Sequence, residues 1–354
     1  MNRSGIEWCD HTMNFITGCH HGCPYCYARR MVQRFSGNVK ENVLRTEQYR
    51  KTEDGLYILE NEFRGEDGKQ VHYPFGFEPT LHEYRFRNLK KLKEGCNIFV
   101  GAMSDVFGDW VPDDWIKQVF MATMGDPQHN YLFLTKNPGR YIELLKSRLL
   151  PDCGNYWYGT SVTCNGDMEK AGRLPADRDS HSYISFEPLR EELAFPEWPW
   201  YKIDWFIIGA ETGNQKGRVR PEKSWIDGIV RVADEHGIPV FMKDSLIPIV
   251  GESGMRRDFP AELKQRRRGK KTEEKLTAPC IRCRKVNDKR RMITLLARAG
   301  RGGMVKTLTC MCRACYRAWC RELCIDGYEK ELFAHVEGGT ESDGKETELQ
   351  TYGG

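Results

Sequence analysis

The chain has 354 residues, of which 40% are hydrophobic and 29% charged, a composition that fits a folded globular protein and argues against wholesale disorder. Its net charge is +4. Its length fits about two domains, or one large barrel with an appendage. No apolar run approaches the roughly 18 residues of a membrane span, and no secretory signal stands at the N-terminus, so we expect a cytoplasmic protein without a membrane partner.

Short runs rich in β-branched and aromatic residues alternate with helix-like segments such as Trp115–Met124 and Arg140–Leu150. The runs are mostly continuous in hydrophobicity, as in strands that are buried on both faces of a parallel sheet. Repeated strand–helix units predict an α/β fold, a full or partial (βα) barrel over residues 1–250, with an open doubly wound sheet as the alternative. The expected strands are Met13–Thr17, Phe75–Leu81, Asn97–Met103, Tyr131–Thr135, Tyr156–Thr163, Ser182–Phe186, Trp205–Gly209 and Pro239–Met242.

Polar residues stand where these expected strands end. In a βα barrel the reactive residues occupy the carboxyl ends of the strands. Any one of these residues would serve equally well as a helix cap, but together they indicate a site at this edge. They are Ser104, Asp105, Lys136, Thr163, Glu187, Glu211, Lys243 and Asp244.

Composition divides the rest of the chain. Residues 36–72 read as an excursion near the first barrel unit, 251–279 as a basic linker, 280–337 as a Cys-rich basic module, and 338–354 as a disordered acidic tail. Residues 256–321 hold 21 Lys and Arg against 5 Asp and Glu, whereas residues 322–354 hold 2 against 9. The basic segment is therefore where we expect a polyanion to bind.

The first cysteine cluster follows the first expected strand. Cys19, Cys23 and Cys26 have the spacing C-x3-C-x2-C, with Tyr25 directly before the last cysteine. Three thiolates are an awkward set for a structural zinc, which takes four closed ligands. On a four-iron cluster, three cysteines leave one iron open to an exogenous ligand. The remaining alternative is a zinc site completed by His20, His21 or Cys9.

This loop resembles the signature of the radical S-adenosylmethionine (SAM) superfamily, whose barrel the (βα) pattern would also give. More narrowly, three stretches are similar to an uncharacterised phage-encoded radical-SAM-like family. They are Ile6-Glu7-Trp8, Ser104-Asp105 and Phe186-Glu187-Pro188-Leu189. This resemblance covers roughly residues 1–245.

The resemblance implies that Cys19, Cys23 and Cys26 bind a [4Fe-4S] cluster whose open iron chelates SAM. One electron, delivered by a reducing partner such as flavodoxin or ferredoxin, then cleaves SAM to a 5′-deoxyadenosyl radical. Tyr25 would lie near the adenine. No Gly-Gly-Glu-Pro stretch follows the second strand, and Gly101–Asp105 would substitute for it. Further cofactor-binding residues are expected among Ser104, Asp105, Glu187 and Glu211.

The second cysteine cluster consists of Cys280 with Cys283 and Cys312 with Cys315. Two C-x2-C pairs are the usual ligand set of a structural Zn²⁺, and an auxiliary iron–sulfur cluster is the alternative. Cys310, Cys320 and Cys324 leave the choice of ligands ambiguous. Because the surrounding module is strongly basic, we expect it to bind nucleic acid, DNA or RNA.

The leading hypothesis is therefore a radical SAM enzyme that modifies or repairs a nucleic acid or a nucleotide-linked substrate. Cys164, just past an expected strand, is a candidate to return a hydrogen atom to a substrate radical, as a cysteine does in spore photoproduct lyases. A buried structural cysteine is the commoner case. The other hypotheses are a non-enzymatic zinc protein that binds nucleic acid, and a radical SAM enzyme that acts on a protein or peptide.

Overall fold

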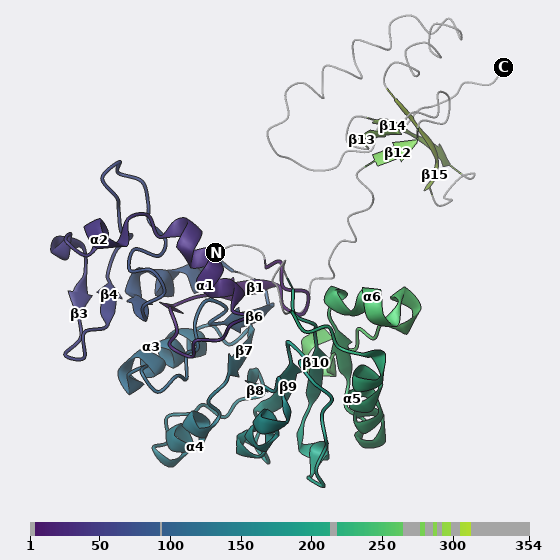
Figure 1. Ribbon diagram of the computed structural model, residues 1–354. Helices are drawn as coiled ribbons and strands as arrows, with labels where there is room; N and C mark the ends of the chain where they lie inside the picture. Colours follow the sequence, from purple (N-terminus) through teal and green to yellow (C-terminus); the bar gives the residue numbers. More distant parts are fainter. Residues whose placement is uncertain are drawn as a thin grey trace, which may run out of the picture. The chain divides into compact units, whose positions relative to one another are not determined.

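The computed structural model describes residues 4–92, 94–212 and 218–264, and the backbone of four strands between residues 277 and 312. It divides into two compact units, Met1–Arg268 and Gly269–Gly354. The first unit is built on a curved parallel sheet (Figure 1). In the part of the chain that is described, no helix is both long and apolar enough to cross a membrane.

The strands of this sheet follow one another in space as they do along the chain. Their order is β1 (His11–Met13), β6 (Asn97–Val100), β7 (Asn130–Thr135), β8 (Tyr156–Ser161), β9 (His181–Phe186), β10 (Trp205–Ile208) and β11 (Val240–Met242). Every neighbouring pair is parallel. A doubly wound sheet would reverse its strand order at a switch point, and this sheet does not. The partial (βα) barrel is thus confirmed, and the doubly wound alternative is wrong.

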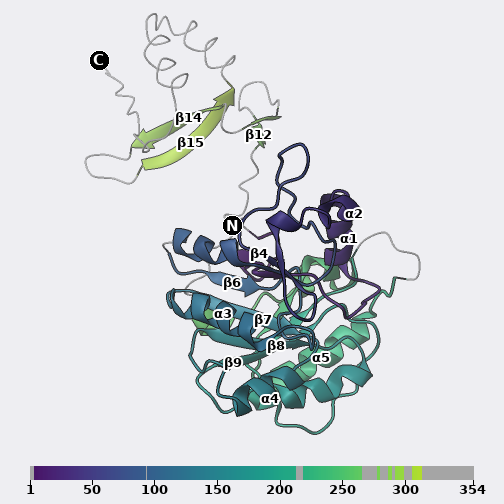
Figure 2. The same ribbon diagram turned by 90° about the vertical axis from the view of Figure 1, so that its left-hand side faces the viewer.

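Helices cover the convex face of the half-barrel (Figures 1 and 2). They are α3 (Asp113–Met124), α4 (Gly139–Lys146) and α5 (Lys223–His236), with the 3-10 segments η2 (Glu83–Lys91) and η3 (Asn165–Arg173). Successive strand residues point to opposite faces. In β6, Ile98 and Val100 belong to the core that includes the helices, whereas Phe99 belongs to a second core on the concave side.

A small separate sheet replaces the second expected barrel strand. It runs β2 (Ile16–Thr17), β5 (Thr80–His82), β4 (Tyr57–Leu59) and β3 (Arg50–Lys51), beside α1 (Tyr27–Phe35), α2 (Val39–Asn42) and η1 (Thr46–Gln48). The prediction of a barrel strand at Phe75–Leu81 was wrong, because Phe75 packs against Tyr57, with ring centroids 3.8 Å apart, in a core of its own. The expected strand Met13–Thr17 is likewise split between the two sheets.

The amino-terminal end of the half-barrel is filled by aromatic side chains. Trp157, Trp205 and Trp8 lie there, each at most 2% exposed. Phe259 and Leu263 join them, so the first part of the segment expected to be a linker packs on the sheet. Stability is the usual role of this end of a βα barrel.

Backbone and side-chain hydrogen bonds attach residues 256–264 to the sheet. Asn97 and Asn130, at the starts of β6 and β7, donate to the carbonyls of Leu263 (3.2 Å) and Glu262 (3.2 Å) in α7 (Ala261–Lys264). Residues 256–258 pair antiparallel with β11 and so cover its free edge. The remaining elements are η4 (Trp200–Lys202), η5 (Asp244–Leu246), α6 (Ile247–Val250) and η6 (Glu252–Gly254).

The second unit contains two antiparallel strand pairs. β12 (Thr277–Pro279) pairs with β13 (Val286–Asp288), and β14 (Met292–Arg298) pairs with β15 (Val305–Cys312). Cys312 is the last residue of β15. The other cysteines of the expected zinc site, Cys280, Cys283 and Cys315, lie outside the described residues, as does the expected acidic tail. The zinc site stays a prediction.

The close approach of β8 and β9 yields the first testable prediction. A Cβ at Gly159 would lie 2.4 Å from the buried ring of Tyr183. Gly159→Ala should therefore lower the free energy of unfolding by about 1–3 kcal/mol, measured by urea denaturation. Gly228→Ala in α5, where a Cβ meets no atom within 4 Å, is the control and should raise it by roughly 0.5–1 kcal/mol. Equal stabilities of the two variants would contradict this packing.

Candidate functional site

The cysteine loop leaves β2 through a glycine that no other residue can replace without strain. Gly18 has φ +88°, and a Cβ there would lie 2.3 Å from the Glu78 carbonyl oxygen. Its N–H donates to the Met103 carbonyl (3.0 Å), and Gly18 pairs in parallel with Ser104. This pairing joins the loop to the segment that follows β6. The loop therefore lies at the mouth of the half-barrel, by which we mean the carboxyl ends of its seven strands.

Hydrogen bonds shape the loop around its three cysteines. The Cys26 N–H donates to the Cys23 carbonyl (3.2 Å), and the Cys26 thiol caps α1 by accepting from the Arg29 N–H (3.4 Å). The Arg29 guanidinium donates back to the Cys19 carbonyl (3.0 Å). The first turn of α1 thus holds both ends of the loop.

The three thiols are electrostatic neighbours. Burial raises the pKa of Cys19 to about 12, and the nearby Asp105, Cys23 and Cys26 act in the same direction. The ligands of a single ion converge on one point, whereas the thiolates of a cubane bind different iron atoms. Among the described residues, no three His, Cys, Asp or Glu side chains converge on one point as the ligands of a single metal ion do. The donor set is three thiols of one short loop, of the soft kind that iron–sulfur clusters take.

The residues that would complete a zinc site have other partners. His20 Nε2 lies 3.1 Å from Glu78 Oε2, and His21 Nε2 lies 2.7 Å from Asp105 Oδ2. Cys9 is buried and its thiol donates to the Ser4 hydroxyl (3.3 Å). These contacts argue against the zinc alternative for the first cluster.

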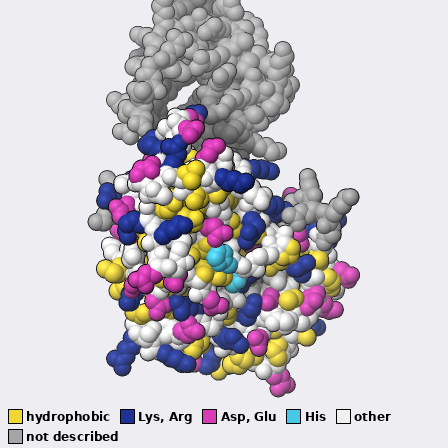
Figure 3. All heavy atoms as spheres, turned by 60° about the vertical axis from the view of Figure 1, so that its left-hand side comes forward, with side chains coloured by type: hydrophobic (Ala, Val, Ile, Leu, Met, Phe, Trp, Pro, Cys, Tyr) yellow, Lys and Arg dark blue, Asp and Glu magenta, His cyan; other side chains and the backbone are white. Residues whose placement is uncertain are grey.

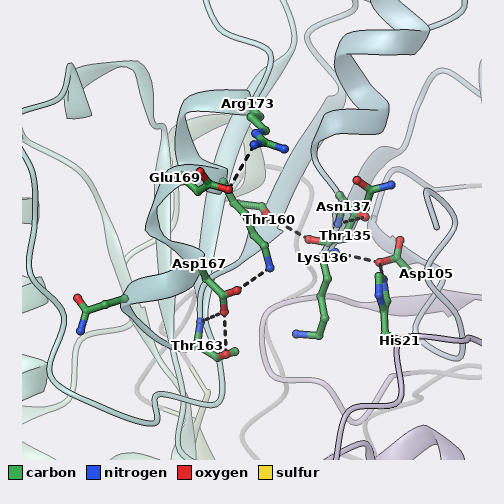
Figure 4. Close-up of polar contacts among 12 residues, drawn as sticks. His21, Asp105, Thr135, Lys136, Asn137, Thr160, Thr163, Asp167, Glu169 and Arg173 are labelled. Atoms are coloured by element: carbon green, nitrogen blue, oxygen red, sulfur yellow. Dashed lines mark hydrogen bonds and ion pairs between the residues drawn. The ribbon is translucent and has the colours of Figure 1, made fainter. Parts of the chain in front are cut away.

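Asp105 connects the cysteine loop to two strands (Figure 4). Its Oδ2 accepts from His21 and from the Lys136 N–H at the end of β7 (2.9 Å), and its Oδ1 accepts from the Phe107 N–H (3.0 Å). The residue is 5% exposed. Because both of its oxygens accept hydrogen bonds from within the chain, Asp105 positions the loop.

A second charged contact crosses the mouth above β10. Glu187, after β9, forms an ion pair with Lys243, after β11. A Cβ on the intervening Gly209 would lie 3.0 Å from Glu187 Cγ and 3.1 Å from Lys243 Cδ. Burial acts to lower the pKa of Lys243, but the Glu187 carboxylate outweighs it, so the pKa is raised and the lysine stays charged.

Two cations lie over the ring of Tyr25. Lys136 Nζ is 5.3 Å from the centroid of its ring and Arg190 Cζ is 5.4 Å from it. Each such contact contributes roughly 0.5–1 kcal/mol where the cation is exposed, and more where it is desolvated. Burial acts to lower the pKa of Lys136, but the Tyr25 and Cys23 side chains outweigh it and raise the pKa. Lys136 is thus a charged neighbour of the cysteine loop.

The other expected residues have more varied settings. The Ser104 hydroxyl is buried and has no hydrogen-bond partner among the described residues. Thr163 donates from its N–H (2.9 Å) and its hydroxyl (2.8 Å) to Asp167 and so acts as a structural anchor. Cys164 is a half-buried free thiol that follows β8. Glu211 is half-buried three residues beyond the end of β10.

Sequence reasoning missed two members of the site, Arg190 and the His21–Asp105 pair. Arg190 follows the end of β9 by four residues, too far to count as a strand-end residue, and reaches the site because its N–H donates to the Thr163 carbonyl (3.1 Å). His21 was considered only as a metal ligand. Its nearness to Asp105 depends on a contact across 84 positions of the chain.

Comparison with known proteins gives a family. Residues 3–277 match a family model described as "Protein of unknown function (DUF5131)". The chain belongs to this family. No curated protein matches its sequence.

Solved structures give a distant likeness in fold. A cysteine-to-serine variant of spore photoproduct lyase is 11% identical with a TM-score of 0.38, covering 68% of this chain and 79% of that one. Another variant of that enzyme, with bound AdoMet and dinucleoside spore photoproduct, is 11% identical with a TM-score of 0.34, covering 84% and 68%. At this identity the likeness concerns the arrangement of elements alone.

One face of the molecule is drawn in Figure 3. Hydrophobic side chains gather there in a patch bordered by Lys and Arg, with His side chains beside it. On α1, which begins directly after Cys26, Tyr27 (46% exposed), Met31 (40%) and Phe35 (54%) are large exposed apolar residues. At spacings of four residues they share one face of the helix.

Removing the Asp105 carboxylate should destabilise the protein. Asp105→Ala leaves the N–H groups of Lys136 and Phe107 buried without acceptors, so we expect the free energy of unfolding to fall by about 1–3 kcal/mol. Asp109→Ala is the control, because Asp109 is exposed and its carboxylate accepts a hydrogen bond from the Asn137 side chain (2.7 Å). It should change stability by no more than about 0.5 kcal/mol. Equal urea midpoints for both variants would contradict the role of Asp105.

Proposed function

We propose that this protein is a radical SAM enzyme whose [4Fe-4S] cluster is bound by Cys19, Cys23 and Cys26, and that it modifies or repairs a nucleic acid or a nucleotide-linked substrate. One observation carries the proposal: three neighbouring thiols, spaced C-x3-C-x2-C, lie at the mouth of a parallel half-barrel, where βα barrels place their chemistry. When bound, the reduced cluster supplies the electron that cleaves SAM.

The residues around the loop fit such a group. Three thiols leave one iron of a cubane without a protein ligand, and the loop histidines are held away by Glu78 and Asp105. The buried, unpartnered Ser104 hydroxyl supplies a polar group for SAM beside the loop. In this proposal Tyr25, Glu187 and Glu211 line the remaining cofactor space at the mouth.

The rest of the chain orients and shields the reacting groups. The Arg29 guanidinium fixes the loop backbone at Cys19, and the aromatic layer around Trp157 closes the far end of the half-barrel to water. Excluding water protects a radical from side reactions. The cofactor and substrate then share the carboxyl end of the strands.

A nucleic acid is the preferred substrate because of charge. Residues 256–321 hold 21 Lys and Arg against 5 Asp and Glu, an excess suited to a phosphate backbone. A peptide substrate offers no general reason for such an excess. A zinc-binding C-terminal module and a reducing partner such as flavodoxin or ferredoxin complete the proposal.

Cys164 is proposed to return a hydrogen atom to the substrate radical. Its thiol is free and half-buried after β8, at the same mouth as the loop. Hydrogen transfer breaks the S–H bond and leaves a sulfur-centred radical. Cys164→Ser should therefore keep its iron and still cleave SAM, while substrate turnover stops.

The decisive test is anaerobic reconstitution with iron and sulfide, followed by dithionite and SAM. Cys23→Ala should lose the broad visible absorbance of the loop cluster and the formation of 5′-deoxyadenosine, detected by mass spectrometry. Cys153→Ala is the matched control, because Cys153 is an exposed free thiol in the loop before β8, and it should behave as the wild type. Wild-type 5′-deoxyadenosine formation by Cys23→Ala would refute the ligand assignment.

A further inference from the structure

Two cations at the mouth of the half-barrel have no ion-pair partner among the described residues. Lys136 and Arg190 come from different strand ends, after β7 and β9, and both lie over the ring of Tyr25 at 5.3 and 5.4 Å. Both side chains are half-buried, so water screens their mutual repulsion only in part.

The carboxylates near them already have partners. Asp167 accepts from Thr163 and pairs with Lys170 (2.6 Å), and Glu187 pairs with Lys243. Among the described residues, neither Lys136 nor Arg190 has a carboxylate oxygen within 4.0 Å. Figure 4 shows Lys136 with its ammonium outside every hydrogen bond and ion pair that is drawn.

Arg190 has a second sign of a missing partner. Its Nε is buried and has no hydrogen-bond acceptor. Buried guanidinium donors are normally satisfied, and the described part of the chain supplies no acceptor for this one. Arginine binds phosphate oxygens through its planar fork of donors, and lysine binds them as a point charge.

We propose that Lys136 and Arg190 bind a phosphate group of the substrate, at the mouth of the half-barrel beside Tyr25. The group is a backbone phosphodiester of a nucleic-acid strand or the phosphate of a nucleotide. The inference rests on the proposed function, because it places the substrate next to the cysteine loop. In this proposal the same polyanion meets both groups of cations. The basic segment 256–321 attracts it by its overall charge, and Lys136 and Arg190 contact one of its phosphates.

The test measures binding of the full-length chain to a short fluorescein-labelled single-stranded oligonucleotide, by fluorescence anisotropy over a range of salt concentrations. Lys136→Gln and Arg190→Gln should each weaken binding about tenfold, as expected for loss of one charge-assisted contact. The double variant should lower the slope of affinity against salt by about 0.7, the contribution of one phosphate in a single strand.

Arg173→Gln is the matched control. Arg173 is exposed and pairs with Glu169 (3.2 Å), so its loss should leave affinity and salt slope at the wild-type values. Lys136→Arg keeps the charge and should retain most of the affinity. A tenfold loss in Lys136→Arg as well would assign the effect to altered packing and overturn the proposal.

Competition experiments identify the anion that the two cations bind. Competition by a nucleoside monophosphate would identify a nucleotide phosphate, whereas competition only by an oligonucleotide would identify a backbone phosphodiester. Unchanged oligonucleotide binding in the double variant overturns the proposal. So does a loss of SAM affinity with unchanged oligonucleotide binding, since the cations would then hold the SAM carboxylate.

This binding assay needs neither iron nor SAM. Its result is therefore separate from the iron content and SAM cleavage that test the proposed function.

Discussion

The site depends on one buried carboxylate. Asp105 receives hydrogen bonds from His21 of the cysteine loop, from the Lys136 N–H at the end of β7 and from the Phe107 N–H of its own turn. A loop of this length has no core of its own, so its position must come from such contacts. The same carboxylate fixes the backbone from which Lys136 extends toward Tyr25. The geometry of the thiols and that of the cation pair are consequently linked through Asp105.

The half-barrel separates stability from chemistry along its strands. At the amino end, aromatic side chains and the segment that carries Phe259 and Leu263 fill the concave face. At the carboxyl end, the same alternation of side chains brings polar groups inward: Lys136, Glu187 and Lys243. A sheet that closed on itself would leave less room at the mouth. The proposed function places a cofactor and a substrate at this open mouth.

Charge at the mouth is distributed unevenly. Lys243 and Lys170 each have a carboxylate partner, whereas Lys136 and Arg190 have no ion pair within the described part of the chain and both lie over the ring of Tyr25. An ion pair that is satisfied within the chain positions its neighbours, and a cation that is not satisfied attracts a ligand. The proposed phosphate site rests on this contrast between neighbouring groups and not on the net charge of the chain.

The sequence alone determined the parallel α/β class, the helices α3 and α4 and the spacing of the three cysteines, because each is written in short-range patterns of hydrophobicity and residue type. It also placed polar residues at the strand ends. Only the tertiary structure decided that Phe75–Leu81 serves a separate small sheet, that residues 256–264 pack on the barrel, and that Arg190 reaches Tyr25. These features depend on contacts between distant parts of the chain, such as that of Asn97 with Leu263. Local periodicity in the sequence carries no information about such contacts.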